Sequence, residues 1–261
     1  AFYDVPCGKC GFCLSNQRKQ WTYRLQKERT QHATSYFTTY TYSDCNLCYG
    51  DDDNGNTYRI LVKKDFQDFM KRLRKAQAKL KGPKMKYYAV GEYGARTNRP
   101  HYHALLFGLL PELAKDLWKI WKLGLVDVGE VNTKTISYVT KYVINRRQHK
   151  HYVVPPFSLI SNGIGLGHLQ KNEEFYKYRG TVRNEGGFKQ AIPRYYKQKL
   201  EQPKGYASMV SAAQNKEMEE KVRKELERLK KHAKDPVLYD EERAQVNSRK
   251  ILKRSKEGGT L

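Results

Sequence analysis

The sequence lacks any apolar run long enough to cross a membrane, and it is short of acidic residues. Its 50 Lys and Arg face 27 Asp and Glu, which gives a formal net charge of +23. A surplus of that size implies a polyanionic partner, and without a membrane-spanning run it favours nucleic acid over a membrane surface. Residues 201–261 carry 15 Lys and Arg against 11 Asp and Glu, so +19 of the charge belongs to the first 200 residues. The basic surface is therefore expected on the domain that holds the motifs described below, and not on a tail.

A nucleotide-binding phosphate loop is also missing. The glycine-rich stretch 161–167 lacks the Lys-Ser/Thr ending that such a loop needs, so we interpret it as an ordinary loop. Aromatic residues, by contrast, are plentiful. The 20 tyrosines supply flat faces on which unpaired bases can stack.

The chain does contain a histidine pair that runs into an apolar segment typical of a β-strand. His101 and His103 lie two apart, so on a strand both side chains point to one face and Tyr102 points to the other. Residues 84–91 predict a preceding strand that ends at Glu92, and a turn after it would bring this carboxylate beside the histidines. Two imidazoles and a carboxylate can hold a divalent cation, and the oxygen ligand favours Mg²⁺ or Mn²⁺. Histidines at this spacing also occur without a metal, on surfaces and in cores, but the carboxylate favours the metal site.

A second motif follows on a predicted helix, for which Asn132 and Thr133 are candidate N-caps. Tyr138, Lys141 and Tyr142 share one face of that helix. A different stripe holds its aliphatic residues, Ile136, Val139 and Val143. Tyrosines on an amphipathic helix are often only core residues, but these lie off the aliphatic stripe. A tyrosine hydroxyl is a poor nucleophile at neutral pH and needs a neighbouring cation, and Lys141 is placed to supply one.

These motifs in this order resemble the HUH endonucleases of rolling-circle replication. The resemblance is greatest to the replication initiator proteins of small single-stranded-DNA phages, the Microviridae and particularly the gokushoviruses. It covers roughly residues 5–200, and three further stretches agree with it: 5–10, 66–74 and 155–160.

The resemblance implies site-specific nicking of single-stranded DNA by transesterification. Glu92, His101 and His103 would hold Mg²⁺ or Mn²⁺ against the scissile phosphate. Tyr138 would attack phosphorus, which leaves a 5′-phosphotyrosine link and a free 3′-hydroxyl for polymerase.

The remaining roles follow from the same resemblance. Tyr142 would be the second nucleophile when the replicated circle is cut and closed, and Lys141 would position the metal site or stabilise charge near the phosphate. The implied partners are single-stranded DNA with its replication origin, a host helicase and a host polymerase. The implied location is the cytoplasm of a host bacterium.

Two other functions stay open at this point. A basic single-strand DNA-binding or packaging protein without catalysis would explain the charge and the tyrosines. A metal-dependent phosphodiesterase that uses activated water would explain the metal ligands. Neither accounts for the carboxylate, the histidine pair and the two tyrosines together.

The five cysteines are arranged as one run and one pair. Cys7, Cys10 and Cys13 follow one another at intervals of three, and Cys45 and Cys48 come later. Paired CxxC units are typical of structural zinc, so we expect a zinc site at Cys7, Cys10, Cys45 and Cys48, with Cys13 beginning the following helix. Free thiols remain the alternative, and a disulfide is not expected in a bacterial cytoplasm.

The overall pattern predicts an α+β fold with a central antiparallel sheet of about five strands flanked by helices, as in HUH and ferredoxin-like proteins. The expected strands are 35–42, 58–62, 84–91, the histidine strand and 124–131, and the expected helices are 15–31, 64–80, 111–121 and the tyrosine helix. We expect an endonuclease core with the cysteine segment at 1–145, an irregular basic extension at 146–205, and a charged C-terminal helix and tail at 206–261. The helix is predicted over 207–234 and should end at Asp235-Pro236, with no ordered element after it.

Overall fold

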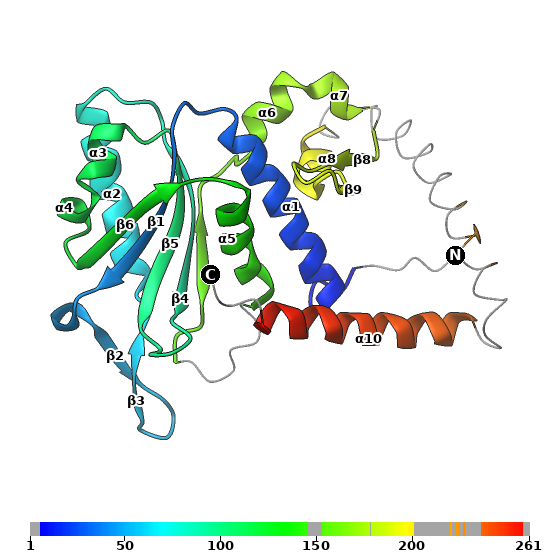
Figure 1. The fold of residues 1–261 in the computed structure, drawn as a ribbon, viewed down its shortest axis with the longest axis horizontal. Helices are drawn as coiled ribbons and strands as arrows, with labels where there is room; N and C mark the ends of the chain where they lie inside the picture. The colour runs from blue at the N-terminus through cyan, green and yellow to red at the C-terminus, as the bar shows by residue number, and fades with distance from the viewer. Residues whose placement is uncertain are drawn as a thin grey trace. The chain divides into compact units, whose positions relative to one another are not determined.

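The computed structural model describes residues 6–145, 153–177, 179–200, 220, 223, 224, 227 and 236–257 (Figure 1). The chain divides into two compact units, one formed by Arg24–His168 and the other by Ala1–Tyr23 with Leu169–Leu261. The expected domain boundary after residue 145 coincides with the edge of a gap in the described residues, and the one after 205 lies outside them. Both boundaries therefore stay predictions.

The Arg24–His168 unit is built on a five-stranded antiparallel sheet with the strand order β6-β1-β5-β4-β7 (Figure 1). The strands are β1 (Ser35–Tyr42), β4 (Lys86–Tyr93), β5 (Pro100–Phe107), β6 (Gly124–Glu130) and β7 (Phe157–Ile160). Helices pack on the two faces of this sheet. The predicted α+β fold with a central antiparallel sheet is thus confirmed.

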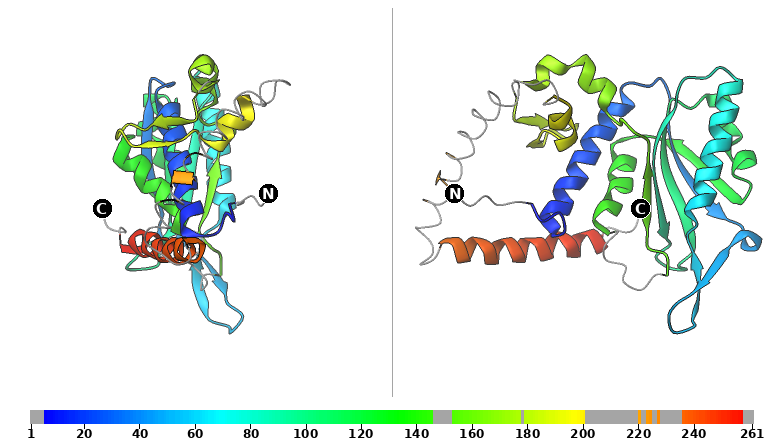
Figure 2. Two further views of the ribbon diagram at one scale, coloured as in Figure 1. Left: turned by 90° about the vertical axis from the view of Figure 1, so that its right-hand side faces the viewer. Right: turned by 180° about the vertical axis from the view of Figure 1, so that it is seen from behind.

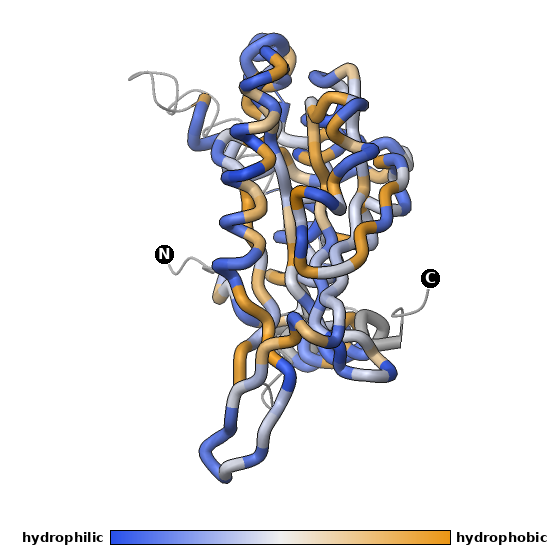
Figure 3. Tube along the Cα trace, turned by 90° about the vertical axis from the view of Figure 1, so that its left-hand side faces the viewer, coloured by the Kyte–Doolittle hydropathy of each residue, from blue (hydrophilic) through white to orange (hydrophobic). Residues whose placement is uncertain are grey.

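One strand of the sheet differs from the prediction. The expected strand at 58–62 is β3 (Thr57–Ile60), which pairs with β2 (Cys48–Asp51) in a separate hairpin. That hairpin extends away from the sheet, and its tip is hydrophilic (Figure 3). The place at the sheet edge is taken by β7, from the stretch predicted to be irregular, which pairs with β4. Four residues are too few to show an alternating pattern, and pairing with a distant strand leaves no local signal.

The first face of the sheet carries the main hydrophobic core. Tyr102, Ala104 and Leu106 alternate along β5 on this face and are almost fully buried. Covering them are α2 (Lys63–Lys79), α3 (Pro111–Lys115) and α4 (Leu117–Trp121), which lie on the same side of the sheet in Figures 1 and 2. The predicted helix over 111–121 is therefore two short helices. Fully burying a side chain such as Phe66 or Phe69 of α2 contributes about 1.5–3 kcal/mol to the free energy of folding.

The opposite face of the sheet is covered by α5 (Thr133–Asn145), which contacts β4 and β5. Asn132 caps this helix, since its side-chain Oδ1 accepts a hydrogen bond of 2.9 Å from the backbone N–H of Thr135. The aliphatic stripe is buried as predicted, with Ile136 and Val139 fully enclosed. Burial of that stripe fixes the rotation of the helix, and so it decides where the tyrosines point.

The other unit has its own small core. Its elements are the start of α1 (Gly11–Arg29), the end of α6 (Leu166–Lys171), α7 (Glu173–Lys177), β8 (Thr181–Arg183), β9 (Lys189–Ala191), α8 (Arg194–Leu200) and α10 (Pro236–Glu257). Tyr23, Tyr176 and Tyr196 are buried together, and the hydroxyls of the first two lie 2.6 Å apart.

The C-terminal prediction was partly wrong. Pro236 begins the helix α10 and does not end an ordered region. Proline is compatible with the first turn of a helix because the N–H that it lacks would have no helical acceptor there. The helix predicted over 207–234 lies almost entirely outside the described residues. Among the helices that the structure describes, none has both the length and the apolar composition needed to cross a membrane.

Candidate active site

Three metal-ligating side chains meet on the face of the sheet that α5 covers. The β4–β5 register places Glu92 opposite His101, and Val90 opposite His103. The Nε2 atoms of the two histidines each lie 2.9 Å from Oε1 of Glu92. One ligand atom from each of the three side chains can be chosen so that all lie within 4.8 Å of one another. The hairpin predicted from the sequence is therefore present and brings the three together; we call them the Glu-His-His triad.

Neighbouring groups hold both imidazole rings in place. Nδ1 of His101 donates to the carbonyl oxygen of Arg99 at 3.0 Å, which directs the unprotonated Nε2 atom toward the site. Nδ1 of His103 lies 3.0 Å from Oγ1 of Thr39, and the Phe37 ring stacks on the His103 ring at a centroid distance of 5.5 Å. The sequence analysis missed both β1 residues. The alternation of β1 puts them on one face, but nothing in the sequence shows that this strand lies beside β5.

The triad is largely buried, with 7% of Glu92 and 7% of His103 exposed. Burial alone would raise the pKa of the Glu92 carboxyl, but its bonds to the two imidazoles outweigh burial and hold that pKa well below its usual range. Burial lowers the pKa of His103, whereas for His101 the Glu92 carboxylate overcomes burial and raises the pKa. A shielded carboxylate beside two imidazole nitrogens is a donor set that fits a divalent cation such as Mn²⁺ or Mg²⁺. Three protein ligands also leave coordination positions for substrate oxygens.

Two tyrosines from α5 reach this triad. The Tyr138 hydroxyl donates to Oε1 of Glu92 at 3.2 Å and lies 3.2 Å from Nε2 of His103. The Tyr142 hydroxyl donates to the oxygen of Tyr138 at 3.1 Å. The two tyrosines are one helical turn apart on the predicted face, so both hydroxyls belong to one site.

Lys141 lies against the faces of both tyrosine rings. Its Nζ atom is 3.9 Å from the ring centroid of Tyr138 and 5.0 Å from that of Tyr142, which are cation–π contacts. Burial, reinforced by the Glu92 charge, raises the pKa of Tyr138 to about 12, and the pKa of Tyr142 is raised by the same two causes. Without a bound cation the site therefore keeps both tyrosines protonated.

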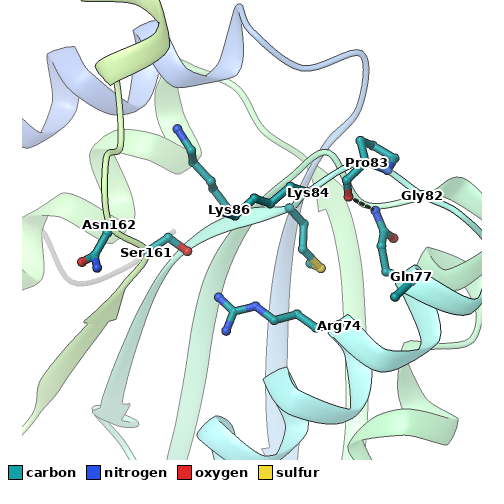
Figure 4. Close-up of a pocket in the computed structure, with 10 residues that line it drawn as sticks. Arg74, Gln77, Gly82, Pro83, Lys84, Lys86, Ser161 and Asn162 are labelled. Atoms are coloured by element: carbon teal, nitrogen blue, oxygen red, sulfur yellow. Dashed lines mark hydrogen bonds between the residues drawn. The ribbon is translucent and has the colours of Figure 1, made fainter.

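A second concave site lies near the opposite end of β4. It is a cavity of about 590 Å³ that is open to solvent and lined in part by Arg74, Lys84 and Lys86 (Figure 4). Lys86 precedes Glu92 by six residues on the same extended strand, a separation of roughly 20 Å. The cavity is thus distinct from the triad.

The structure gathers the cysteines differently from the prediction. The sulfurs of Cys7, Cys10 and Cys13 lie within 4.8 Å of one another. Cys45 and Cys48 belong to the Arg24–His168 unit, and neither joins a group of three metal-ligating side chains among the described residues. The predicted zinc site at Cys7, Cys10, Cys45 and Cys48 stays a prediction, and Cys13 is the ligand candidate that it left out.

Comparisons with known proteins bear on the same region of the chain. Residues 35–154, which include the triad and both tyrosines, match the family model for the ORF2-type replication-associated proteins. The chain is 29% identical over 221 residues to replication-associated protein ORF2 of Spiroplasma virus 4, a match that covers 76% of this chain and 68% of that protein. It is 28% identical over 233 residues to replication-associated protein ORF4 of Chlamydia phage 1, covering 76% and 54%. It is 28% identical over 220 residues to replication-associated protein VP4 of Bdellovibrio phage phiMH2K, covering 75% and 67%. No solved structure matches the chain significantly.

Proposed function

Since this chain belongs, through residues 35–154, to the ORF2-type family of replication-associated proteins, we propose that it initiates rolling-circle replication by nicking single-stranded phage DNA at the origin. The proposed reaction is transesterification by a tyrosine in the manner of an HUH endonuclease. The observation that carries it is the position of the Tyr138 hydroxyl, 3.2 Å from both Glu92 Oε1 and His103 Nε2. A hydroxyl so placed can attack a phosphate that is held at the triad.

The residues divide the chemistry among them. Glu92, His101 and His103 hold Mg²⁺ or Mn²⁺, which when bound polarises the scissile phosphate and stabilises developing negative charge. The Tyr138 oxygen forms a bond to phosphorus, and the bond from phosphorus to the 3′ oxygen breaks. The phenolic proton leaves to solvent, and the departing 3′ oxygen takes up a proton. The products are a 5′-phosphotyrosine and a free 3′-hydroxyl that a polymerase can extend.

Tyr142 repeats this step on the newly made strand. Its hydroxyl is 3.1 Å from that of Tyr138, so a small movement of α5 or of its side chains exchanges the two at one phosphate site. Once Tyr142 has cut the new strand, the released 3′-hydroxyl attacks the first phosphotyrosine and closes the circle. Lys141 keeps both rings in position through its contacts with their faces.

The partners follow from this role. Single-stranded DNA that carries the origin is the substrate, and it is held largely by the excess of basic side chains in the first 200 residues. Nicking neither separates strands nor extends them, so a host helicase and a host polymerase supply those two steps. The protein then acts in the bacterial cytoplasm.

The test is capture of the covalent intermediate. The full chain is incubated with origin-containing single-stranded DNA and Mn²⁺ or Mg²⁺, quenched with denaturant, and analysed for a protein–DNA adduct. We expect an adduct with the natural sequence and none with Tyr138→Phe combined with Tyr142→Phe. Cleavage without an adduct would identify a phosphodiesterase that uses water. DNA binding without cleavage would identify a binding or packaging protein.

A further inference from the structure

The N-terminal cysteines form a compact thiol cluster that has no part in the proposed nicking reaction. Cys7 and Cys10 lie in a turn before α1, and Cys13 lies in the first turn of that helix. The Cys7 and Cys13 sulfurs are 3.9 Å apart, and all five cysteines are free thiols. We propose that Cys7, Cys10 and Cys13 bind one Zn²⁺ ion as three thiolate ligands.

The spacing of the sulfurs fits a single tetrahedral ion. A Zn–S bond is about 2.3 Å long, so two thiolates on one tetrahedral zinc lie about 3.8 Å apart. The observed 3.9 Å between Cys7 and Cys13 matches that separation. In an iron–sulfur cluster each thiolate binds a different iron, which holds the sulfurs farther apart. Disulfide bonding would leave one of the three thiols unpaired.

The backbone of the turn is arranged to accept a charged sulfur. The N–H groups of Lys9 and Cys10 donate to the Cys7 sulfur at 3.4 Å and 3.3 Å. Gly8 makes this possible with a φ of +68°, a conformation that other residues rarely adopt. Hydrogen bonds of this kind stabilise a thiolate and orient it for a metal.

The zinc would fasten a junction between two helices of the same unit. Immediately after Cys10, the N–H of Gly11 donates to Oγ of Ser248 in α10 at 2.8 Å. The approach is so close that a Cβ at Gly11 would lie 2.6 Å from the Ser248 carbonyl oxygen. Binding of zinc would hold the turn before α1 in the shape that this contact requires. The fourth tetrahedral position is left for water.

The proposal is tested on the full chain, purified without chelator. Metal analysis should give about one equivalent of zinc and no iron or acid-labile sulfide. Alkylation of the native protein followed by mass spectrometry should find Cys7, Cys10 and Cys13 protected, and all three should react once a chelator is present. Cys45 and Cys48 should not gain reactivity on chelation. This pattern needs no variant and does not depend on nicking activity.

Matched substitutions then separate the two possible ligand sets. Cys13→Ser should reduce bound zinc severalfold or more, whereas Cys45→Ser should leave it at about one equivalent. Zinc that persists in Cys13→Ser, or that is lost in Cys45→Ser, would overturn the three-thiolate site in favour of a set that includes Cys45 and Cys48. Absence of zinc, or iron with sulfide, would overturn it as well. If Cys13→Ser fails to fold, the alkylation pattern of the natural sequence decides.

Discussion

The Tyr138 hydroxyl lies 3.2 Å from the Nε2 atom of His103, although 35 positions separate the two residues in the chain. The contact joins a helix to the central strand of the sheet, so it is fixed by packing and not by a flexible loop. It brings a weak nucleophile and a metal-ligating ring to one point. Each of the predictions on catalysis below depends on that placement.

The first prediction concerns the metal. His103→Ala should abolish nicking, because it removes one of three ligands, and should leave single-stranded DNA binding nearly unchanged. Binding comes mainly from Lys and Arg that neutralise phosphates, so it should weaken steeply as salt rises in both proteins. Adduct assays and a salt series of binding titrations measure the two properties separately. His168→Ala, which removes a histidine outside the triad, is the control. Parallel loss of binding and nicking in a folded His103→Ala protein would contradict the assignment.

The second prediction concerns Thr39, which holds the His103 ring. Thr39→Val keeps the volume of the side chain but removes the hydroxyl that lies 3.0 Å from Nδ1. Loss of such an orienting contact typically lowers metal affinity about 10- to 100-fold. A titration of adduct formation against Mn²⁺ should therefore shift to higher metal concentration, with the rate at saturating metal much less affected. Thr41→Val, two residues along the same strand, should not shift the titration; an equal shift in both variants would assign the effect to the strand itself.

The third prediction concerns stability and pH. Glu28 is almost fully buried and bonds to His32, Lys86 and the N–H of Gly165. Burial would raise the pKa of this carboxyl, but its bonds to these three partners outweigh burial and lower the pKa below the ordinary value of 4.5. A lowered pKa in the folded state means that Glu28 stabilises the fold above pH 4.5, and that this stabilisation is lost as pH falls through the folded-state pKa.

Glu28→Gln tests this prediction, since glutamine keeps the shape but not the charge. Near neutral pH the variant should be less stable by about 1–3 kcal/mol, the usual cost of leaving buried partners unsatisfied. Urea unfolding over a range of pH should show the difference shrinking below pH 4.5. A difference that is the same at every pH would show that the charge of Glu28 contributes nothing.

The parts of the site that the sequence predicted are those set by local periodicity. Alternation along a strand put His101 and His103 on one face, and a single hairpin brought Glu92 to them. Helical spacing put Tyr138 and Tyr142 one above the other. Each of these inferences needs only one element, or two that are adjacent in the chain.

The parts that escaped prediction depend on which distant segments pair. Thr39 joins the site because β1 lies between β5 and β6, and no pattern within β1 specifies its neighbours. The same reason explains why β7 and not β3 completes the sheet. Cys13 was assigned to a helix start and not to the thiol cluster, but it occupies both places, because the first turn of α1 is also the end of the cysteine run.

The last prediction concerns the two tyrosines, and it separates a two-nucleophile mechanism from a site with one nucleophile and one packing residue. If both act, Tyr138→Phe and Tyr142→Phe should each still form some adduct, and only the double variant should form none. Each single variant should nick DNA but release no closed circle, because termination needs a second tyrosine while the first is still linked. If Tyr142 only packs against Tyr138, Tyr142→Phe should nick and close circles like the natural protein, and Tyr138→Phe alone should be inactive. Peptide mapping of the DNA-linked tyrosine in each variant decides between the two. We expect both to be linked, with Tyr138 the main site in the natural protein, because its hydroxyl directly contacts Glu92 and His103.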